Sequence, residues 1–176
     1  MCLVLAWIAV SAASGRAAPD AALTVENYKP GETIRYPVPL LRGTIADPAV
    51  RSLTITNESA TREPRETQAL VHKGRFLGLT ELVPGENHLV LRAGDHSLRL
   101  TLNYRPQTNQ YIVRVIYFTG SEGETGYQTP LADDSQDFRG KLATAMKLMQ
   151  TFTAERLNDL GLGRRTFNLE TDPQGD

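Results

Sequence analysis

A period-two alternation of apolar and polar residues, broken by turn signals about every ten residues, constrains the fold of residues 23–104 more than any other feature. In the segment 98–104 (LRLTLNY), apolar residues alternate with polar ones, so one face of a strand is buried and the other meets solvent. Leu89 and Leu91 predict the opposing strand. The dipeptide Gly94-Asp95 suits a tight hairpin between the two strands, because glycine readily adopts a positive φ.

Turn sequences and prolines divide the rest of this region into further short strands. Residues 29–32 (KPGE) and 84–87 (PGEN) predict turns, and Pro37 and Pro39 predict an edge strand or a bend between sheets, because proline cannot donate a ladder hydrogen bond. About seven short strands without a helical stretch indicate an Ig-like β-sandwich over residues 23–105. Cys2 is the single cysteine of the chain, so burial between the inner faces, and not a disulfide, must stabilise this sandwich.

A different pattern follows the polar linker that begins at residue 106. Residues 111–118 (YIVRVIYF) predict a strand covered on both faces. An apolar stripe then runs from Phe138 to Leu160 and predicts a helix whose Met146 and Met149 pack into a core, with Asp134 or Ser135 as its cap and Gly161 as its stop. The other residues of this stripe are Leu142, Phe152 or Thr153, and Leu157.

Residues 164–169 predict a second short strand, so the region reads strand, helix, strand. This order is typical of the opening of an α/β layer, with a right-handed crossover between parallel strands. Two strands and one helix leave much apolar surface uncovered, so we expect residues 106–176 to be the start of a truncated α/β domain. The predicted fold class is mainly β: an Ig-like β-sandwich followed by an incomplete α/β segment.

The chain opens with a short apolar run, residues 2–10 (CLVLAWIAV), followed by small residues. The run is too short to span a bilayer as a helix. It predicts a signal peptide over residues 1–22, although no Lys or Arg precedes it; the alternative is a buried N-terminal strand. We therefore expect a secreted or periplasmic protein with no membrane span after signal removal.

Charge and residue types exclude several classes of function. The net charge is −1, so no basic field favours nucleic acid or an anionic membrane. A single cysteine provides no thiolate metal cluster, and His72, His88 and His96 form no His-x-x-x-His pair. Any zinc site within this chain would need histidine and carboxylate ligands.

Four local patterns suggest chemistry and have simpler explanations. The loop 119–126 (TGSEGETG) lacks the spacing of either phosphate-binding pattern, and its glutamates would repel an anion. Asp133, Asp134 and Asp137 lack the remaining positions of a calcium loop and are explained by helix capping.

The other two patterns lie in the strand-rich region. Residues 95–97 (DHS) contain the residue types of a hydrolase triad. Because neighbours on a strand point to opposite faces, these three cannot form the catalytic relay together, and a hairpin turn explains them. Residues 57–59 (NES) are a formal glycosylation acceptor. We therefore expect no catalytic, cofactor-binding or metal-ligating residue in this chain.

Residues 148–157 (LMQTFTAERL), 160–167 (LGLGRRTF) and 31–40 (GETIRYPVPL) resemble a family of zinc metallopeptidases. Members carry an Ig-like segment before a His-Glu-x-x-His catalytic domain. The resemblance implies that residues 111–169 are the first strand, first helix and second strand of a zincin-type domain. It also implies zinc in the full-length protein, held by a motif that this chain lacks. The matching residues are carried over only as framework: Gln150, Phe152, Glu155, Arg164 and Arg165.

The resulting functional hypothesis is the N-terminal, non-catalytic portion of an exported zinc metallopeptidase, whose full-length enzyme acts on a protein or peptide substrate. The alternative is an exported Ig-like binding or adhesion module without enzymatic activity, with a glycan or protein ligand. The scattered aromatic residues Tyr28, Tyr36 and Phe76 offer no platform for a glycan, which weakens the alternative. A different hydrolase behind a generic Ig-like module stays open, because a fold does not fix a function.

Overall fold

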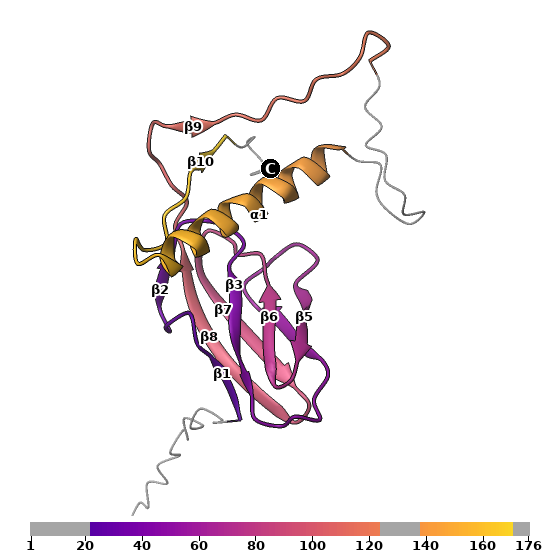
Figure 1. The fold of residues 1–176 in the computed structure, drawn as a ribbon, viewed down its shortest axis with the longest axis vertical. Helices are drawn as coiled ribbons and strands as arrows, with labels where there is room; N and C mark the ends of the chain where they lie inside the picture. The colour runs from indigo at the N-terminus through magenta and orange to yellow at the C-terminus, as the bar shows by residue number, and fades with distance from the viewer. Residues whose placement is uncertain (1–21, 124–137, 171–176) are drawn as a thin grey trace, which may run out of the picture.

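The computed structural model of the chain describes residues 22–123 and 138–170. It is mainly β, as the alternation predicts: an eight-stranded sheet, one long helix and a two-stranded sheet. The helix α1 crosses one end of the large sheet, and the two-stranded sheet lies on the far side of α1 (Figure 1). The predicted signal peptide (save its last residue), Asp133, Asp134, Ser135 and Asp137 lie outside the described residues.

The large sheet has the strand order β1-β3-β6-β5-β4-β7-β8-β2. Its neighbours pair antiparallel except β2 and β8, which are parallel. The strands are β1 (Leu23–Val25), β2 (Glu32–Ile34), β3 (Leu40–Ile45), β4 (Leu53–Asn57), β5 (Glu66–His72), β6 (Arg75–Leu79), β7 (Gly85–Ala93) and β8 (His96–Tyr104).

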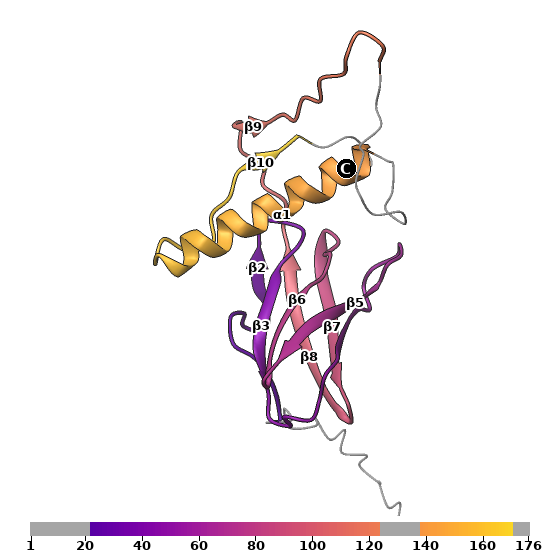
Figure 2. The same ribbon diagram turned by 45° about the vertical axis from the view of Figure 1, so that its right-hand side comes forward.

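Strand β5 changes partners along its length and so curls the sheet. Its residues 66–69 pair with β4, whereas residues 70–72 pair with β6. The two halves of the sheet therefore face each other (Figure 2). The apolar side chains between them form one core, in which the largest fully buried members are Tyr36, Phe76, Leu23, Ile34, Leu41, Leu53, Ile55, Leu89, Leu91 and Leu102.

The hairpin and the bend between sheets both follow the sequence prediction. Strands β7 and β8 pair from Gly85↔Tyr104 to Ala93↔His96, and Gly94 in their turn has a φ of 58°. Pro37 and Pro39 lie between β2 and β3, which belong to opposite halves of the sheet. The bend between sheets is therefore confirmed, and the prolines replace no ladder hydrogen bond.

Helix α1 (Phe138–Asp159) ends where the sequence predicts. Gly161 has a φ of 77°, and its amide donates to the carbonyl oxygen of Asn158 at 2.9 Å. The amide of Leu162 donates to the carbonyl oxygen of Leu157, also at 2.9 Å. These two bonds are those of a Schellman cap. Within the described residues, the structure has no helix long and apolar enough to cross a membrane.

Strands β9 (Ile112–Val113) and β10 (Asn168–Leu169) pair in parallel, so the predicted parallel arrangement of strand, helix and strand is confirmed. The predicted length of the first strand is wrong, because only two of residues 111–118 form a ladder. Apart from Tyr117, which stacks on Phe138 with ring centroids 4.7 Å apart, residues 111–118 are exposed. A two-residue partner strand cannot cover an eight-residue apolar run on either face.

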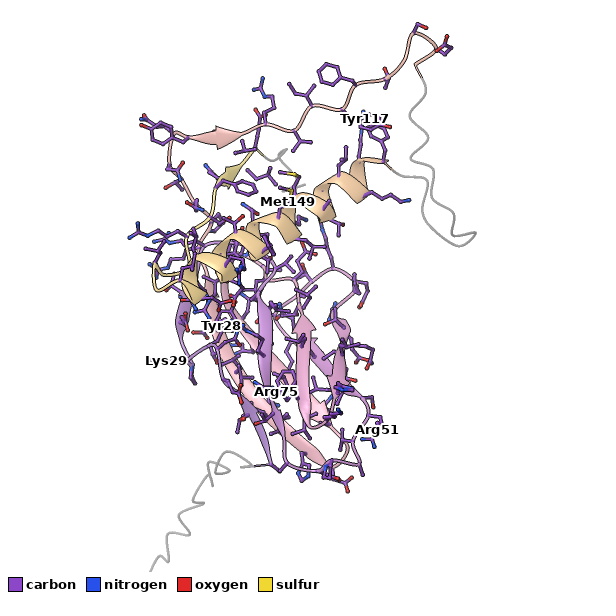
Figure 3. All side chains as sticks on the ribbon, viewed as in Figure 1. Tyr28, Lys29, Arg51, Arg75, Tyr117 and Met149 are labelled. Carbon is purple, nitrogen blue, oxygen red and sulfur yellow. The ribbon has the colours of Figure 1, made fainter. Side chains whose placement is uncertain are left out.

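The predicted packing face of α1 is also wrong. Met149 and Phe152, members of the apolar stripe, are 54% and 67% exposed. Figure 3 shows Met149 on the side of the helix that faces away from the large sheet. The buried residues of α1 are instead Gln150, Thr151, Ala154 and Glu155. The helix meets the sheet through a mainly polar face because the end of the sheet presents hydrogen-bonding groups there.

Gly43 in β3 lies opposite Phe76 of β6, and a Cβ at this glycine would come within 1.9 Å of the Thr24 carbonyl oxygen and 2.6 Å of the Phe76 ring. We expect Gly43→Ala to lower the free energy of unfolding by about 1 to 3 kcal/mol, the usual cost of overpacking. Urea denaturation followed by circular dichroism measures the change. The control is Gly120→Ala in an exposed loop, where the nearest atom is the end of a flexible glutamate; equal midpoints for the two variants would contradict the close approach.

Candidate functional site

The buried carboxylate of Glu155 is the centre of the contact between α1 and the large sheet. Its side chain is 7% exposed. The residues around it come from four segments that are distant in sequence: the β1–β2 connection, the start of the β2–β3 connection, β3 and the turn after α1. The site therefore forms only when the helix lies across the end of the sheet (Figure 1).

One carboxylate oxygen of Glu155, Oε1, accepts three hydrogen bonds. The hydroxyls of Tyr28 and Tyr36 donate to it at 2.7 and 2.9 Å, and Nε of Arg164 donates at 2.9 Å. The two hydroxyl oxygens are themselves 2.8 Å apart. Tyr28 and Tyr36, which are not adjacent in sequence, are thus brought together, but both are buried and form no exposed aromatic platform.

The other oxygen, Oε2, faces β3. Nη2 of Arg42 donates to it at 2.9 Å, and Nδ2 of Asn27 lies at 3.4 Å. The same Arg42 nitrogen reaches Oδ1 of Asp159 at 3.2 Å, one helical turn after Glu155. Asn27 is fixed in turn by β3, because it donates to the Leu40 carbonyl oxygen and accepts from the Arg42 amide, at 2.7 and 2.8 Å.

Arg164, in the turn after α1, uses its whole guanidinium group. Nε binds Glu155, Nη1 donates to Oε1 of Glu32 at 2.8 Å, and Nη2 donates to the Asn27 carbonyl oxygen. The guanidinium carbon also lies 4.1 Å from the centre of the Tyr28 ring, a cation–π contact. Arginine suits this position because its planar fork can make several directed bonds at once.

The environment keeps Glu155 ionised. Burial raises the pKa of this carboxyl, but the hydrogen bonds from Arg164 and Tyr28 and the positive charge of Arg164 outweigh burial and lower the pKa below its usual value. Burial and the neighbouring negative charge of Glu155 raise the pKa of Tyr28 and of Tyr36, so both stay protonated donors. A lowered folded-state pKa means that Glu155 stabilises the fold above its unfolded pKa and loses that effect as the pH falls through the folded value.

Neighbouring residues of α1 complete the anchor. Ala154 belongs to the apolar core, and the Thr151 hydroxyl donates to the Val38 carbonyl oxygen. Gln150 donates to the Phe167 carbonyl oxygen at 3.0 Å, and so ties the segment leading into β10 to the helix. Lys147 reaches Glu81 of the large sheet's β6–β7 connection at 2.9 Å.

The five residues expected from the family resemblance to be framework residues divide into two groups. Gln150, Glu155 and Arg164 converge on this anchor, whereas Phe152 and Arg165 are exposed. The sequence carries one local signal for this face. Thr151 and Ala154 are small residues next to a charged Glu155, as expected where a helix approaches another element closely and buries an ion pair.

The geometry makes this site an anchor and not a reaction centre. Both oxygens of Glu155 are occupied by donors, and Arg164 has no open direction toward a substrate. The described residues also contain no group of three or more His, Cys, Asp or Glu that could hold a metal ion. The residues of the anchor itself therefore do not form a zinc site.

The local patterns singled out in the sequence have structural roles where they are described. Residues 95–97 belong to the β7–β8 hairpin, and His96 pairs with Ala93 in the ladder. In the glycine-rich loop, the Gly123 amide donates to the Gly120 carbonyl oxygen at 3.0 Å, which closes a turn; residues 124–126 lie outside the described part.

The formal glycosylation acceptor Asn57 is 1% exposed. Its amide nitrogen donates to the Glu81 carbonyl oxygen and to Oδ1 of Asn87, both at 2.9 Å. Both amide hydrogens are therefore engaged inside the sheet. The folded protein offers no free acceptor nitrogen at this position.

Comparisons with known proteins match both the sheet and the helical segment. A family described as "Putative peptidase family" matches residues 22–176. A protein of Schizosaccharomyces pombe (strain 972 / ATCC 24843) named "Putative zinc metalloproteinase" is 28% identical over 104 residues, which are 57% of this chain and 17% of that protein. The chain thus spans about a sixth of the length of this relative.

Two solved structures are similar in part. Domains 4 and 5 of the S-layer protein SbsC give a TM-score of 0.34 at 8% identity, covering 47% of this chain and 50% of that one. Domains 5–6 of the same protein give 0.35 at 7% identity, covering 49% and 46%. Both scores are too low to indicate a shared fold.

Replacing Glu155 tests the anchor. Glu155→Gln removes the negative charge and leaves the guanidinium groups of Arg42 and Arg164 half-buried without it, so we expect the free energy of unfolding to fall by about 3 kcal/mol. Chemical denaturation followed by circular dichroism measures this change. The matched control is Glu58→Gln, because Glu58 pairs with Arg99 at 2.8 Å on the exposed surface and should cost less than about 1 kcal/mol. Similar losses in the two variants would contradict the anchor.

Proposed function

Because the chain belongs to the "Putative peptidase family", we propose that it forms the N-terminal, non-catalytic portion of an exported zinc metallopeptidase. The observation that carries the proposal is the extent of the family match, residues 22–176, which includes the large sheet, α1 and the β9–β10 pair. The similarity to a relative named as a zinc metalloproteinase supports the chemistry, and the small share of that relative's length supports a catalytic centre elsewhere.

The first unit in this proposal is an Ig-like module over residues 23–105. In an Ig-type sandwich, strands A, B, E and D form one sheet and strands C, F and G the other. The observed order β1-β3-β6-β5 followed by β4-β7-β8 matches that arrangement when β1 is strand A and β8 is strand G. Strand β2 then adds an edge strand to the second sheet, parallel to β8.

The second unit is the framework start of the peptidase domain, residues 106–176. Its apolar side chains support this reading, because those of Ile116, Phe118, Phe152 and Leu160 are each at least 65% exposed. Large apolar side chains this exposed, on two neighbouring segments, are unusual on a finished surface. We propose that the remainder of the peptidase domain covers them in the full-length protein.

The role of the described residues is to orient this framework. The Glu155 anchor fixes the long axis of α1 on the end of the sandwich, and Gln150 fixes the approach to β10 from the helix. A domain built on α1 therefore takes its position from the sandwich. Zinc would supply a polarised water for peptide hydrolysis, held by residues of the full-length protein beyond those described. The substrate in this proposal is a protein or peptide, and the leader at residues 1–22 directs the protein out of the cytoplasm, to a secreted or periplasmic location.

Metal content and proteolysis of two chains test the proposal. We expect the 176-residue chain to bind zinc no better than a control protein, and the full-length gene product to bind about one zinc and cleave unfolded casein in a chelator-sensitive way. Metal content is measured by mass spectrometry and cleavage by release of labelled fragments. A full-length product without zinc, or chelator-sensitive cleavage by the 176-residue chain, would overturn the proposed division of roles.

A further inference from the structure

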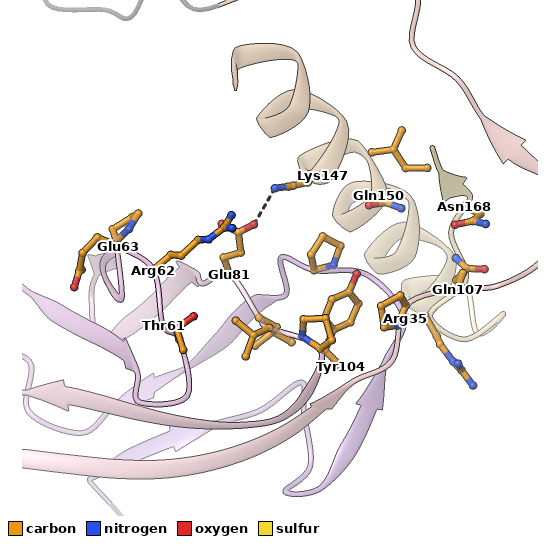
Figure 4. Close-up of a pocket in the computed structure, with 18 residues that line it drawn as sticks. Arg35, Thr61, Arg62, Glu63, Glu81, Tyr104, Gln107, Lys147, Gln150 and Asn168 are labelled. Atoms are coloured by element: carbon orange, nitrogen blue, oxygen red, sulfur yellow. Dashed lines mark hydrogen bonds and ion pairs between the residues drawn. The ribbon is translucent and has the colours of Figure 1, made fainter. Parts of the chain in front are cut away.

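A groove of about 580 Å³ lies beside the anchor, between the end of the large sheet and α1. Three parts of the chain form its walls: the loops between sheet strands, the helix, and the linker with β10. Figure 4 shows Arg62 and Arg35 at opposite ends of the groove, with Tyr104 between them. Its volume is within the range of ligand-binding clefts, and many of its lining residues are exposed, so it is open to a chain passing through.

The groove carries an excess of unpaired positive charge. Its two carboxylates are already engaged, since Glu81 pairs with Lys147 at 2.9 Å and Glu63 pairs with Arg65 at 3.4 Å. Arg35 and Arg62 are exposed, and neither has an ion pair or a side-chain hydrogen bond with another described residue. Two guanidinium groups are therefore available to an anionic ligand.

The remaining lining adds one available donor and apolar surface. The Tyr104 hydroxyl has no hydrogen-bond partner among the described residues and is a further available donor. Pro37, Pro84 and Pro106 line the groove as well and have no amide hydrogen to donate. The walls thus combine apolar surface with donors from side chains, and their carboxylates are already paired.

We propose that this groove binds an extended, acidic segment of polypeptide. Because Arg35 and Arg62 lie at the two ends, a ligand with more than one carboxylate can contact both, whereas a small anion would be held at one end alone. Arginine recognises carboxylates with two parallel hydrogen bonds, and the open, proline-lined centre suits an extended backbone. The groove is formed by the described residues themselves, so this inference does not depend on zinc or on peptide cleavage.

Fluorescence anisotropy with labelled peptides tests the site on the 176-residue chain. The probe is a fluorescein-labelled decapeptide of alternating Glu and Pro, and its counterpart replaces every Glu by Gln. We expect the acidic peptide to bind at least about tenfold more tightly than the neutral one, and its affinity to fall with added salt. Equal affinities for the two peptides would overturn the proposal.

Variants locate the binding. We expect Arg35→Gln and Arg62→Gln each to weaken binding of the acidic peptide by about threefold to fivefold, because each removes one exposed charge pair. Arg51→Gln is the matched control, since Arg51 is an exposed arginine at the far end of the sheet from α1 (Figure 3). Thermal melts should be unchanged, because neither groove arginine has a structural partner.

Two further outcomes would also overturn the inference. Losses no larger than that of Arg51→Gln would place the binding elsewhere on the protein. Full displacement of the peptide by millimolar inorganic phosphate would show a small-anion site at one end of the groove and not a site for an extended segment.

Discussion

A carboxylate removed from water keeps its charge only if other groups replace the lost hydration. For Glu155, these groups come both from the large sheet and from the helical segment that crosses its end. Tyr28, Tyr36 and Arg42 belong to the sheet side, and Arg164 follows the helix. Neither side can satisfy its own polar groups alone. The position of α1 on the end of the sheet is therefore set by hydrogen-bond geometry, which is more directional than apolar packing.

This polar contact accounts for the unusual distribution of apolar residues. Because the helix meets the large sheet through Thr151 and Glu155, apolar residues of its stripe such as Met149 and Phe152 are left over for another partner. Met149, Phe152 and Leu160 of the stripe are exposed. Residues 111–118, most of them exposed, lie on the side of α1 away from the large sheet (Figure 2). The proposed function accounts for both observations, because in it an Ig-like sandwich fixes the first helix of a peptidase domain and leaves that helix's apolar face for the rest of the domain.

The sequence predicted the sheet well because its signals are local. Alternation within a strand and the glycine at residue 94 each act over a few residues, and the structure confirms the hairpin that they predict. The end of α1 could be predicted for the same reason, because its signal is the single glycine at residue 161. The proposed domain boundary near residue 105 stays a prediction, and the Glu155 anchor crosses it.

The anchor could not be predicted in the same way because its partners are far apart along the chain. Glu155 lies 127 residues from Tyr28 and 119 from Tyr36, so no local sequence pattern contains Glu155 together with either tyrosine. The apolar stripe of α1 was a real pattern, but periodicity identifies an apolar face and not the element that covers it. The predicted strand length was wrong at residues 111–118 for a related reason, because only Ile112 and Val113 have a ladder partner among the described residues.

Native-state hydrogen exchange tests most directly whether α1 and the sheet are one unit joined through Glu155. The account predicts that amides in the middle of α1, around Ala154, exchange with the same free energy of opening as those in the centres of β7 and β8, and that this agreement is lost in the Glu155→Gln variant. Exchange of the helix in the unaltered chain at a much lower free energy than the sheet would contradict it, because the helix would then be opening without the anchor that defines its position.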